Sequence, residues 1–307
     1  MGYAAQKRLT GLIMRQLMEN IKRLTGGGLP DDYMAVDIEA TGTDPRKDLI
    51  LEWGHCLVRN REPVERNGTL LNWYMLPDAV PPAWLDKRLA ILQRVMSLDG
   101  RRWHITPERL KKEGEHPHEV LKAIHSLLNE ADKQNLTIIS HCGLNFDLKM
   151  LLMHFEKDLQ LPSPFNGRPR FIDTGALEKA SQLPPDVALP RRDETLDRYM
   201  SRILAHKAQG VYYNLDKHCL EKYGFAEKHG FSLSDMHSAV QDAYVVHLLF
   251  EEYRRLGEAE HVRETIAKRN IPVPVDSSPD SLPEVKSGAE AIFPPAGARR
   301  FRGQRNR

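Results

Sequence analysis

Acidic side chains with the types and spacing of a metal centre begin with Asp37 and Glu39, which flank Ile38 in a mostly apolar run. On a strand, residues i and i+2 point to the same face, so the two carboxylates would project together. Their mutual repulsion favours a divalent cation between them, and oxygen ligands suit Mg²⁺ or Mn²⁺. An acidic strand end that faces water is the alternative, and this pair alone does not decide between them.

Three further residues of these types lie far along the chain. Asp147 starts a predicted helix just after a short apolar strand, where sites of α/β sheets assemble, although a helix-capping Asp is the alternative. His237 and Asp242 are five residues apart, and on one regular helix their side chains diverge by roughly 140°. They converge only if His237 lies on the preceding loop and Asp242 in the second turn of the helix. Otherwise, Asp242 faces solvent and His237 is a cap.

Hydrophobic patterns predict the elements that position these residues. Three strands with short connections favour an antiparallel meander, and alternating helices and strands follow it. The predicted strands cover 33–38, 49–58, 69–75, 136–140 and 171–172; the predicted helices cover 84–96, 117–128, 146–155, 174–180, 215–223 and 238–255, with another start at Thr106-Pro107-Glu108. The order indicates an α/β fold, a mixed sheet flanked by helices.

Three ordered motifs resemble those of the DnaQ-like 3′–5′ exonucleases, in their histidine-containing (DEDDh) form. The motifs are Val36-Asp37-Ile38-Glu39-Ala40-Thr41-Gly42, Asn145-Phe146-Asp147-Leu148 and His237-Ser238-Ala239-Val240-Gln241-Asp242-Ala243. Shorter similarities lie between them, at Ile50-Leu51-Glu52-Trp53-Gly54, Ile172-Asp173-Thr174 and Asn214-Leu215-Asp216 to Tyr223-Gly224. The resemblance covers about 32–256 and implies a ribonuclease H-like sheet, an antiparallel meander plus parallel strands.

The resemblance also implies a reaction and a role for each site residue. Asp37, Glu39 and Asp242 would ligate two divalent ions, Mg²⁺ or Mn²⁺, with Asp37 bridging and Asp147 holding the second ion mainly through water. His237 would be the general base that activates the attacking water. The backbone and hydroxyl around Ala40, Thr41 and Gly42 would contact the terminal nucleotide. The substrate would be a single-stranded DNA or RNA 3′ end, and the product a nucleoside 5′-monophosphate.

The second motif departs from the family pattern. Many members place His-Asn five and four residues before the Asp, whereas this chain has Cys142 and Gly143 there, with His141 one residue earlier. We therefore assign no substrate contact to His141.

The composition sets the domain organisation. Of 307 residues, 41% are hydrophobic and 28% charged, as in a globular protein with a core, and no apolar run reaches the length of a membrane span. We expect an amphipathic helix and Gly-rich linker at 1–30, an exonuclease domain at 31–257, and a mostly disordered basic tail at 258–307. Three cysteines without metal-ligand spacing favour a reducing, cytoplasmic setting. Organellar targeting by the first helix is the alternative, on its early basic residues.

Other features have a plainer alternative. The first helix packs on the domain or on a protein partner. The C-terminal tail is a second candidate for a protein partner, and its arginines at 299–307 bind phosphate or remain solvated. The pairs His141-Cys142 and His218-Cys219 are too far apart in sequence for a zinc motif. Side chains that either contact nucleotides or have structural roles are Trp73, Trp84, Trp103, Arg88, Arg101 and Arg102. At the level of function, a proofreading or processing subunit of a complex and an inactive nucleic-acid-binding scaffold stay open as alternatives.

Overall fold

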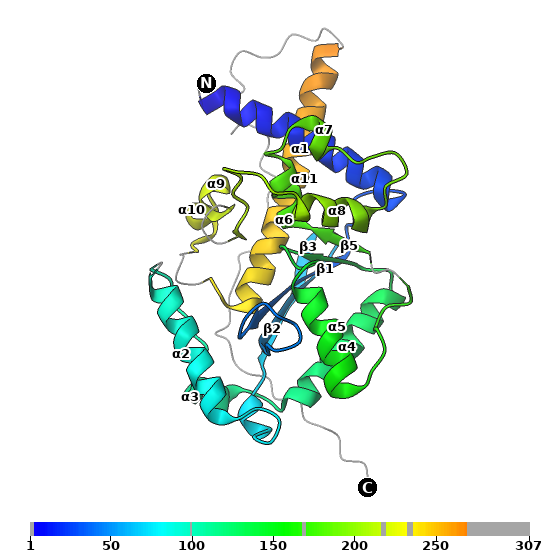
Figure 1. The fold of residues 1–307 in the computed structure, drawn as a ribbon. Coiled ribbons are helices and arrows are strands. Elements are labelled where there is room, and N and C mark those ends of the chain that lie inside the picture. Colours follow the sequence, from blue (N-terminus) through cyan, green and yellow to red (C-terminus); the bar gives the residue numbers. More distant parts are fainter. Residues whose placement is uncertain (1–2, 99, 168–169, 216–218, 232–235, 269–307) are drawn as a thin grey trace. The chain divides into compact units, whose positions relative to one another are not determined.

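The computed structural model describes residues 3–98, 100–167, 170–215, 219–231 and 236–268. Its centre is a five-stranded sheet with the order β3-β2-β1-β4-β5 (Figure 1). The strands are β1 Tyr33–Ala40, β2 Ile50–Arg59, β3 Glu62–Leu70, β4 Thr137–Ser140 and β5 Phe171–Asp173. Strand β2 runs antiparallel to β1 and β3, whereas β4 runs parallel to β1 and β5. The predicted mixed sheet with a meander and parallel strands is thus confirmed.

The third strand lies earlier in the chain than predicted. Asn60 and Arg61 both have positive φ, at 51° and 70°, and form the tight turn between β2 and β3. Strand β3 then runs along the sheet edge with most of its residues exposed. It lacks the alternating apolar pattern on which the prediction of a strand at 69–75 relied, and Trp73–Met75 instead form a 3₁₀ turn.

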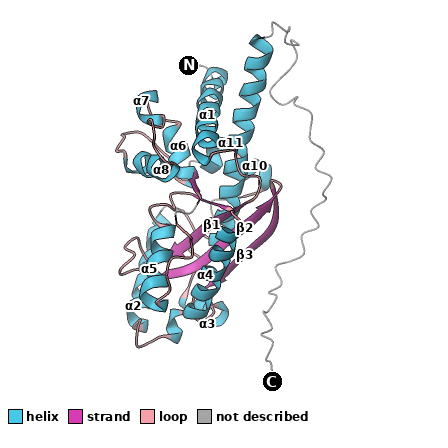
Figure 2. Ribbon diagram, turned by 90° about the vertical axis from the view of Figure 1, so that its right-hand side faces the viewer, coloured by secondary structure: helices cyan, strands magenta, loops and turns pink. Residues whose placement is uncertain are grey.

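The helices cover both faces of the sheet (Figure 2). Their bounds are α1 Tyr3–Thr25, α2 Pro82–Leu98, α3 Pro107–Glu113, α4 Pro117–Lys133, α5 Asp147–Leu159, α6 Thr174–Ala180, α7 Pro185–Ala188, α8 Leu196–Ala205, α9 Leu220–Tyr223, α10 Phe225–His229 and α11 Ala239–Lys268. Most of the predicted helices are present, with ends shifted by a few residues. Helices α7, α8 and α10 were not predicted, and residues 216–218 of the predicted helix at 215–223 lie outside the described residues.

Alternate residues of β1 supply two hydrophobic cores. Met34, Val36 and Ile38 point to one face and pack with apolar residues of α2, α4 and α5. Tyr33 and Ala35 point to the other face and pack with apolar residues of α1, α6, α8 and α11. Trp73 and Trp103 are buried in the first core, so core packing explains them. The side chains of Asp37 and Glu39 share the second face, the face that α11 covers.

Helix α1 packs on the domain. Residues 1–262 belong to one compact unit. The same core cluster as α11 includes four residues of α1: Met14, Leu17, Met18 and Ile21. Packing on the domain is therefore supported as the place of α1.

Helix α11 continues to Lys268, beyond its predicted end at residue 255 and into the segment predicted as tail. The arginines of 299–307 lie outside the described residues.

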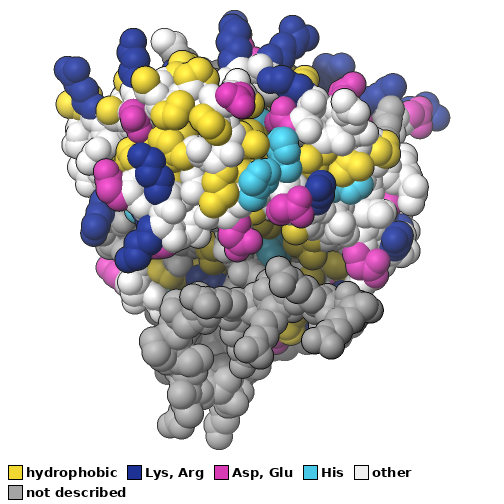
Figure 3. Space-filling view, turned by 90° about the horizontal axis from the view of Figure 1, so that it is seen from below, with side chains coloured by type: hydrophobic (Ala, Val, Ile, Leu, Met, Phe, Trp, Pro, Cys, Tyr) yellow, Lys and Arg dark blue, Asp and Glu magenta, His cyan; other side chains and the backbone are white. Residues whose placement is uncertain are grey.

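The protein surface carries both signs of charge. On the end shown in Figure 3, acidic, basic and hydrophobic side chains are interspersed, and histidines gather near the middle. This mixture agrees with the small net charge of +2. None of the helices in the described part of the chain is long and apolar enough to cross a membrane.

Candidate active site

Strand β1 carries the first two acids of the site in its second half. Asp37 pairs with Gly54 on β2, and Glu39 pairs with Glu52. Glu39 is 9% exposed and Asp37 is half-buried, so both carboxylates lie largely out of water. The alternative of an acidic strand end facing water therefore does not describe Asp37 and Glu39.

Two glycines let the start of α11 approach the sheet beside Asp37. Gly54 pairs with Gly68 on β3, so both glycines lie in the same row of the sheet as Asp37. A Cβ built on Gly54 would lie 2.1 Å from the carbonyl carbon of Ala239, and one on Gly68 would lie 2.0 Å from Cγ2 of Val240. Any side chain larger than hydrogen would displace these neighbours, so the glycines define where α11 begins.

Glu52 fixes the first turn of α11. Its Oε2 accepts a hydrogen bond from the backbone N–H of Ala239 at 3.0 Å and lies 3.1 Å from Nε2 of His104. A carboxylate suits this position because the first N–H groups of a helix have no partner within the helix and carry partial positive charge. Glu52 is 4% exposed, so it acts as an interior clamp between the sheet and the helix.

His237 and Asp242 converge, as the sequence analysis required, because His237 lies before the helix. His237 has a φ of 65°, which turns the chain sharply before α11, and its backbone N–H donates to Oδ2 of Asp242 at 3.1 Å. Asp242 lies in the first turn of α11, not in the second as expected. The two side chains still converge, because the left-handed backbone at His237 reverses the direction of its side chain without a further helical turn.

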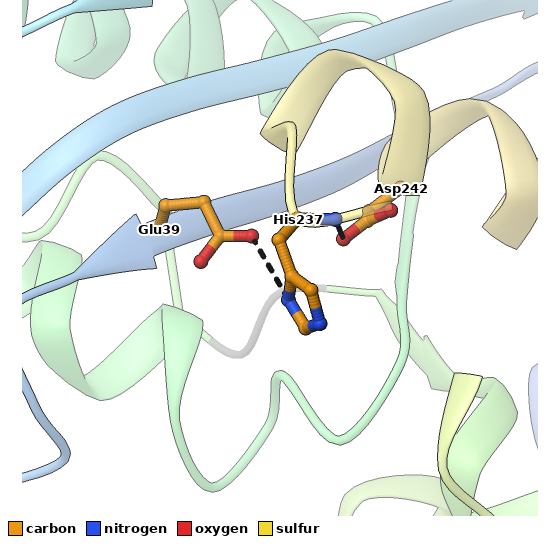
Figure 4. Close-up of side chains that lie close together, drawn as sticks. All are labelled: Glu39, His237 and Asp242. Carbon is orange, nitrogen blue, oxygen red and sulfur yellow. Dashed lines mark hydrogen bonds and ion pairs between the residues drawn. The ribbon is translucent and has the colours of Figure 1, made fainter. Parts of the chain in front are cut away.

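Glu39, His237 and Asp242 come together at one point (Figure 4). Nδ1 of His237 lies 3.6 Å from Oε1 of Glu39, and one ligand atom from each of the three residues lies within 4.8 Å of the others. Figure 4 shows the Glu39 carboxylate, at the strand end, directed toward the imidazole, and the Asp242 carboxylate, at the helix start, directed toward the backbone N–H of His237. Residues from opposite ends of the domain thus form one cluster with the donor atoms of a cation site.

Asp147 reaches the same region from α5, and the loop before it is held by Asp173. Oδ1 of Asp173 accepts the backbone N–H groups of Cys142 and Ala176, and its Oδ2 accepts the N–H of Leu144. Asp173 is fully buried and so orders the turn that leads into Asp147. Its position at the end of β5 explains the Asp-Thr similarity noted in the sequence.

Gly143 has a steric reason in this loop. A Cβ at this position would lie 1.9 Å from Oγ of Ser140 and 2.5 Å from Oδ2 of Asp147. A side chain at this position would therefore displace the Asp147 carboxylate. Gly143 is one of the departures from the family pattern, and its lack of a side chain permits the close approach of this loop to Ser140 and Asp147.

The carboxyl groups of Asp147 and Asp37 have raised pKa values because they are buried and lie near other negative charges. Burial, followed by the charge of Asp173, raises the pKa of Asp147 well above its usual range. Burial, followed by the charges of Asp147 and Asp242, raises the pKa of Asp37 well above its usual range. Burial also raises the pKa of Glu39, while the nearby His237 opposes that rise. The site is therefore a set of carboxylates that destabilise one another unless positive charge is supplied.

The segment Ala40-Thr41-Gly42 leaves the end of β1 and is tied down from several sides. The hydroxyl of Thr41 donates to Oδ1 of Asp48 and accepts the N–H of Leu49, and its carbonyl accepts a hydrogen bond from Arg88. Thr41 is 2% exposed. Its hydroxyl therefore holds the loop in place, and the expected contact between this segment and a nucleotide stays a prediction.

Three residues beside the site were not predicted to belong to it. Glu52 and His104 hold the start of α11, and Nη1 of Arg101 lies 3.0 Å from Nε2 of His237. Arg101 had appeared only among the nucleotide-contact alternatives. The signal for Glu52 was available, because its place opposite Glu39 follows from the register of the first two strands. Arg101 and His104 come from an insertion at 77–104, whose path the sequence did not indicate.

Comparisons with known proteins find similar solved structures at low sequence identity. No protein-family model matches the chain, and the search of curated proteins finds no significant match. Similar solved structures include E. coli exonuclease I in complex with a dT13 oligonucleotide, at 16% identity and a TM-score of 0.46, covering 76% of this chain and 43% of that one. Its complex with a dA16 oligonucleotide gives 17% identity and a TM-score of 0.47, covering 75% and 43%.

A zinc-bound form of the E. coli ExoI–ssDNA complex gives 16% identity and a TM-score of 0.47, covering 75% of this chain and 42% of that one. The chain thus spans less than half the length of the structures to which it is similar. Its own site residues, and not these similarities, carry the functional conclusion.

Proposed function

We propose that the protein is a metal-dependent 3′–5′ exonuclease that shortens DNA or RNA from the 3′ end and releases nucleoside 5′-monophosphates. One observation carries the proposal: acids from β1, α5 and α11 lie within electrostatic reach of one another, with His237 against them. Buried carboxylates that repel one another are unfavourable for a fold, and such arrangements are typical of sites that bind cations. The three ordered sequence motifs supply the reaction type.

The residues present fit divalent ions. Oδ2 of Asp147 is buried and has no hydrogen-bond partner within the described parts of the chain, and the raised pKa values of Asp37 and Asp147 reflect repulsion that a cation removes. Asp37, Glu39, Asp147 and Asp242 would together hold two ions, and all-oxygen donors suit Mg²⁺ or Mn²⁺. When bound, such ions lower the pKa of an attacking water and neutralise charge on the cleaved phosphodiester.

His237 has the place of a general base. It lies on a loop at the rim of the carboxylate cluster, with Nδ1 toward Glu39 and its backbone fixed by Asp242. In this position, Glu39 orients the imidazole through Nδ1, and Nε2 is the nitrogen that takes the proton. Histidine can act as a base in this way near neutral pH. Glu52 and the glycine row keep this loop against the sheet, so they are positioning residues.

The decisive experiment uses 5′-labelled DNA and RNA oligonucleotides incubated with the protein in Mg²⁺ or Mn²⁺. We expect a ladder of shortened products that keep the 5′ label, and release of nucleoside 5′-monophosphates. Asp37→Asn should abolish the ladder, and Asp186→Asn, at an exposed site on α7, should leave it unchanged. Products that lose the 5′ label first, or equal cleavage by Asp37→Asn, would show that the proposal is wrong.

The same assay separates the alternatives. An inactive scaffold would bind oligonucleotides in EDTA and cleave none in Mg²⁺, although all four carboxylates are present in this chain. A proofreading or processing subunit would be active alone, and its activity would change when its partner is added.

A further inference from the structure

Arg101 contacts the predicted general base. Its Nη1 lies 3.0 Å from Nε2 of His237, on the opposite side of the ring from Glu39. Arg101 follows the end of α2, in an insertion that contributes no metal ligand. A positively charged side chain in contact with the general base of a phosphodiester-cleaving site either stabilises the structure or binds the substrate.

The direction of this hydrogen bond is fixed by chemistry. A guanidinium stays protonated and has no acceptor, so Arg101 donates and Nε2 of His237 accepts. The neutral ring then carries its proton on Nδ1, which faces Oε1 of Glu39 at 3.6 Å. In this arrangement, Arg101 covers the lone pair of Nε2, which is the lone pair that a general base needs.

A phosphate is the group best suited to remove Arg101 from His237. Guanidinium binds phosphate oxygens through charge-assisted, often bidentate hydrogen bonds, which are stronger than one bond to a neutral imidazole. The cleaved phosphodiester must lie beside His237 if His237 activates the attacking water. An incoming phosphate therefore lies within reach of Arg101 without a large movement.

The backbone around Arg101 is anchored, so its side chain is the part able to change partner. Gly100, at a φ of 71°, lies just beyond α2, and the N–H of Arg101 donates to the carbonyl of Met96 at 3.0 Å. Trp103 and Ile105 are buried in the core directly afterwards. These anchors hold the Cα of Arg101 near the site on both sides.

We propose that Arg101 binds a phosphate of the substrate strand and, in doing so, releases Nε2 of His237 for catalysis. This inference rests on the proposed function, because it assigns Arg101 to the same site. It makes Arg101 a substrate-binding residue that keeps the base covered until a phosphate arrives. Arg101 recognises the phosphate of the nucleotide and not its nucleobase or sugar, so DNA and RNA ends bind to it alike.

The test measures binding without turnover, in Mg²⁺, of thymidine and uridine 5′-monophosphates and of the two nucleosides that lack the phosphate. Arg101→Ala should weaken binding of both nucleotides by about tenfold to a hundredfold, the effect of losing hydrogen bonds to a charged group, and leave the nucleosides unaffected. Arg101→Lys should recover part of the affinity, since lysine keeps the positive charge but cannot form the bidentate hydrogen bonds of a guanidinium. The control is Arg192→Ala, at an exposed arginine between α7 and α8, which should bind like wild type.

A second readout follows the imidazole itself. In ¹⁵N NMR spectra, adding thymidine 5′-monophosphate should shift the Nε2 signal of His237 in the wild type, and Arg101→Ala should show a shifted signal before any addition. Equal nucleotide affinity in wild type and Arg101→Ala, or equal losses for nucleotide and nucleoside, would overturn the inference. Oligonucleotide shortening by the wild type, measured on the same preparation, tests the proposed function separately.

Discussion

Gly54 lies directly against the backbone of Ala239, so close that a Cβ at Gly54 would be 2.1 Å from the Ala239 carbonyl carbon. Because Gly54 is also the register partner of Asp37, this contact sets the distance between the acids of β1 and the residues that flank the start of α11. The site thus depends on a glycine that carries no functional group.

Replacing Gly54 with alanine tests this dependence. The new methyl group must push the start of α11 away from β2, so we expect a loss of stability of about 1–3 kcal/mol and a loss of most cleavage activity. Urea denaturation and the oligonucleotide assay measure the two effects. Gly27→Ala is the control, because a Cβ there meets nothing within 4 Å. Normal cleavage by Gly54→Ala would mean that this contact does not position His237 and Asp242.

The raised pKa values predict how stability depends on pH and metal. Asp37 and Asp147 have higher pKa values in the folded protein, so their stabilising contribution is complete below the unfolded pKa of about 4 and is lost as pH rises through the folded values. In EDTA, we expect this part of the free energy of unfolding to fall as pH rises from about 4. Mg²⁺ should offset the loss, so the Tm difference between Mg²⁺ and EDTA should grow with pH. Thermal melts in both buffers give this difference.

Asp37→Asn sharpens the same measurement. The variant removes one of the repelling carboxylates, so we expect it to melt higher than wild type in EDTA at neutral pH and to gain less from Mg²⁺. Asp186→Asn should behave like wild type in both buffers. A Tm of Asp37→Asn that rises with Mg²⁺ as much as wild type would contradict a metal site at β1.

His237→Asn separates the base from the metal site. Asparagine tolerates the positive φ of 65° at this position, so the loop should keep its shape. Loss of a general base lowers kcat by about 10²- to 10⁴-fold, and we expect the Mg²⁺-induced rise in Tm to remain. His206→Asn, at the end of α8, is the control. If the variant loses the Mg²⁺ effect as well, His237 is a metal ligand and not the base.

Leu17→Ala tests whether α1 belongs to the domain. Leu17 is 1% exposed within the core that α1 shares with α11, so we expect a loss of about 2–5 kcal/mol in the free energy of unfolding. Leu12→Ala, at a residue that is 38% exposed on the same helix, should cost much less. Similar stabilities for the two variants in urea denaturation would instead favour a helix reserved for a protein partner.

Sequence reasoning predicted the sheet and its acids because both depend on local pattern. The apolar run into Asp37 made β1 recognisable, and the i and i+2 spacing put Glu39 on the same face. Helical geometry made a loop position of His237 the condition for its convergence with Asp242, and the resemblance to the exonuclease motifs favoured that convergence. Spacing and the period of each element predicted the strand and the shared face of its acids, whereas grouping the five residues into one site needed the three ordered motifs.

The rest depended on contacts between distant segments. Nothing in the local sequence indicates that Gly54 meets Ala239 or that Asp173 orders the loop before Asp147. Strand β3 was misplaced because its exposed residues have no partner layer and therefore no apolar alternation. Arg101 was considered as a nucleotide contact, but its place at His237 follows from the path of the insertion through α2 and Trp103.

The polar edge strand has a consequence for the protein in concentrated solution. Pro63 has no N–H to offer a neighbouring strand, and Glu62, Glu65 and Arg66 place charge along β3. A strand from a second molecule would find few hydrogen bonds and unfavourable burial of charge along β3. This side of the sheet therefore resists edge-to-edge aggregation, and the open end of the meander is protected by its composition instead of by a covering helix.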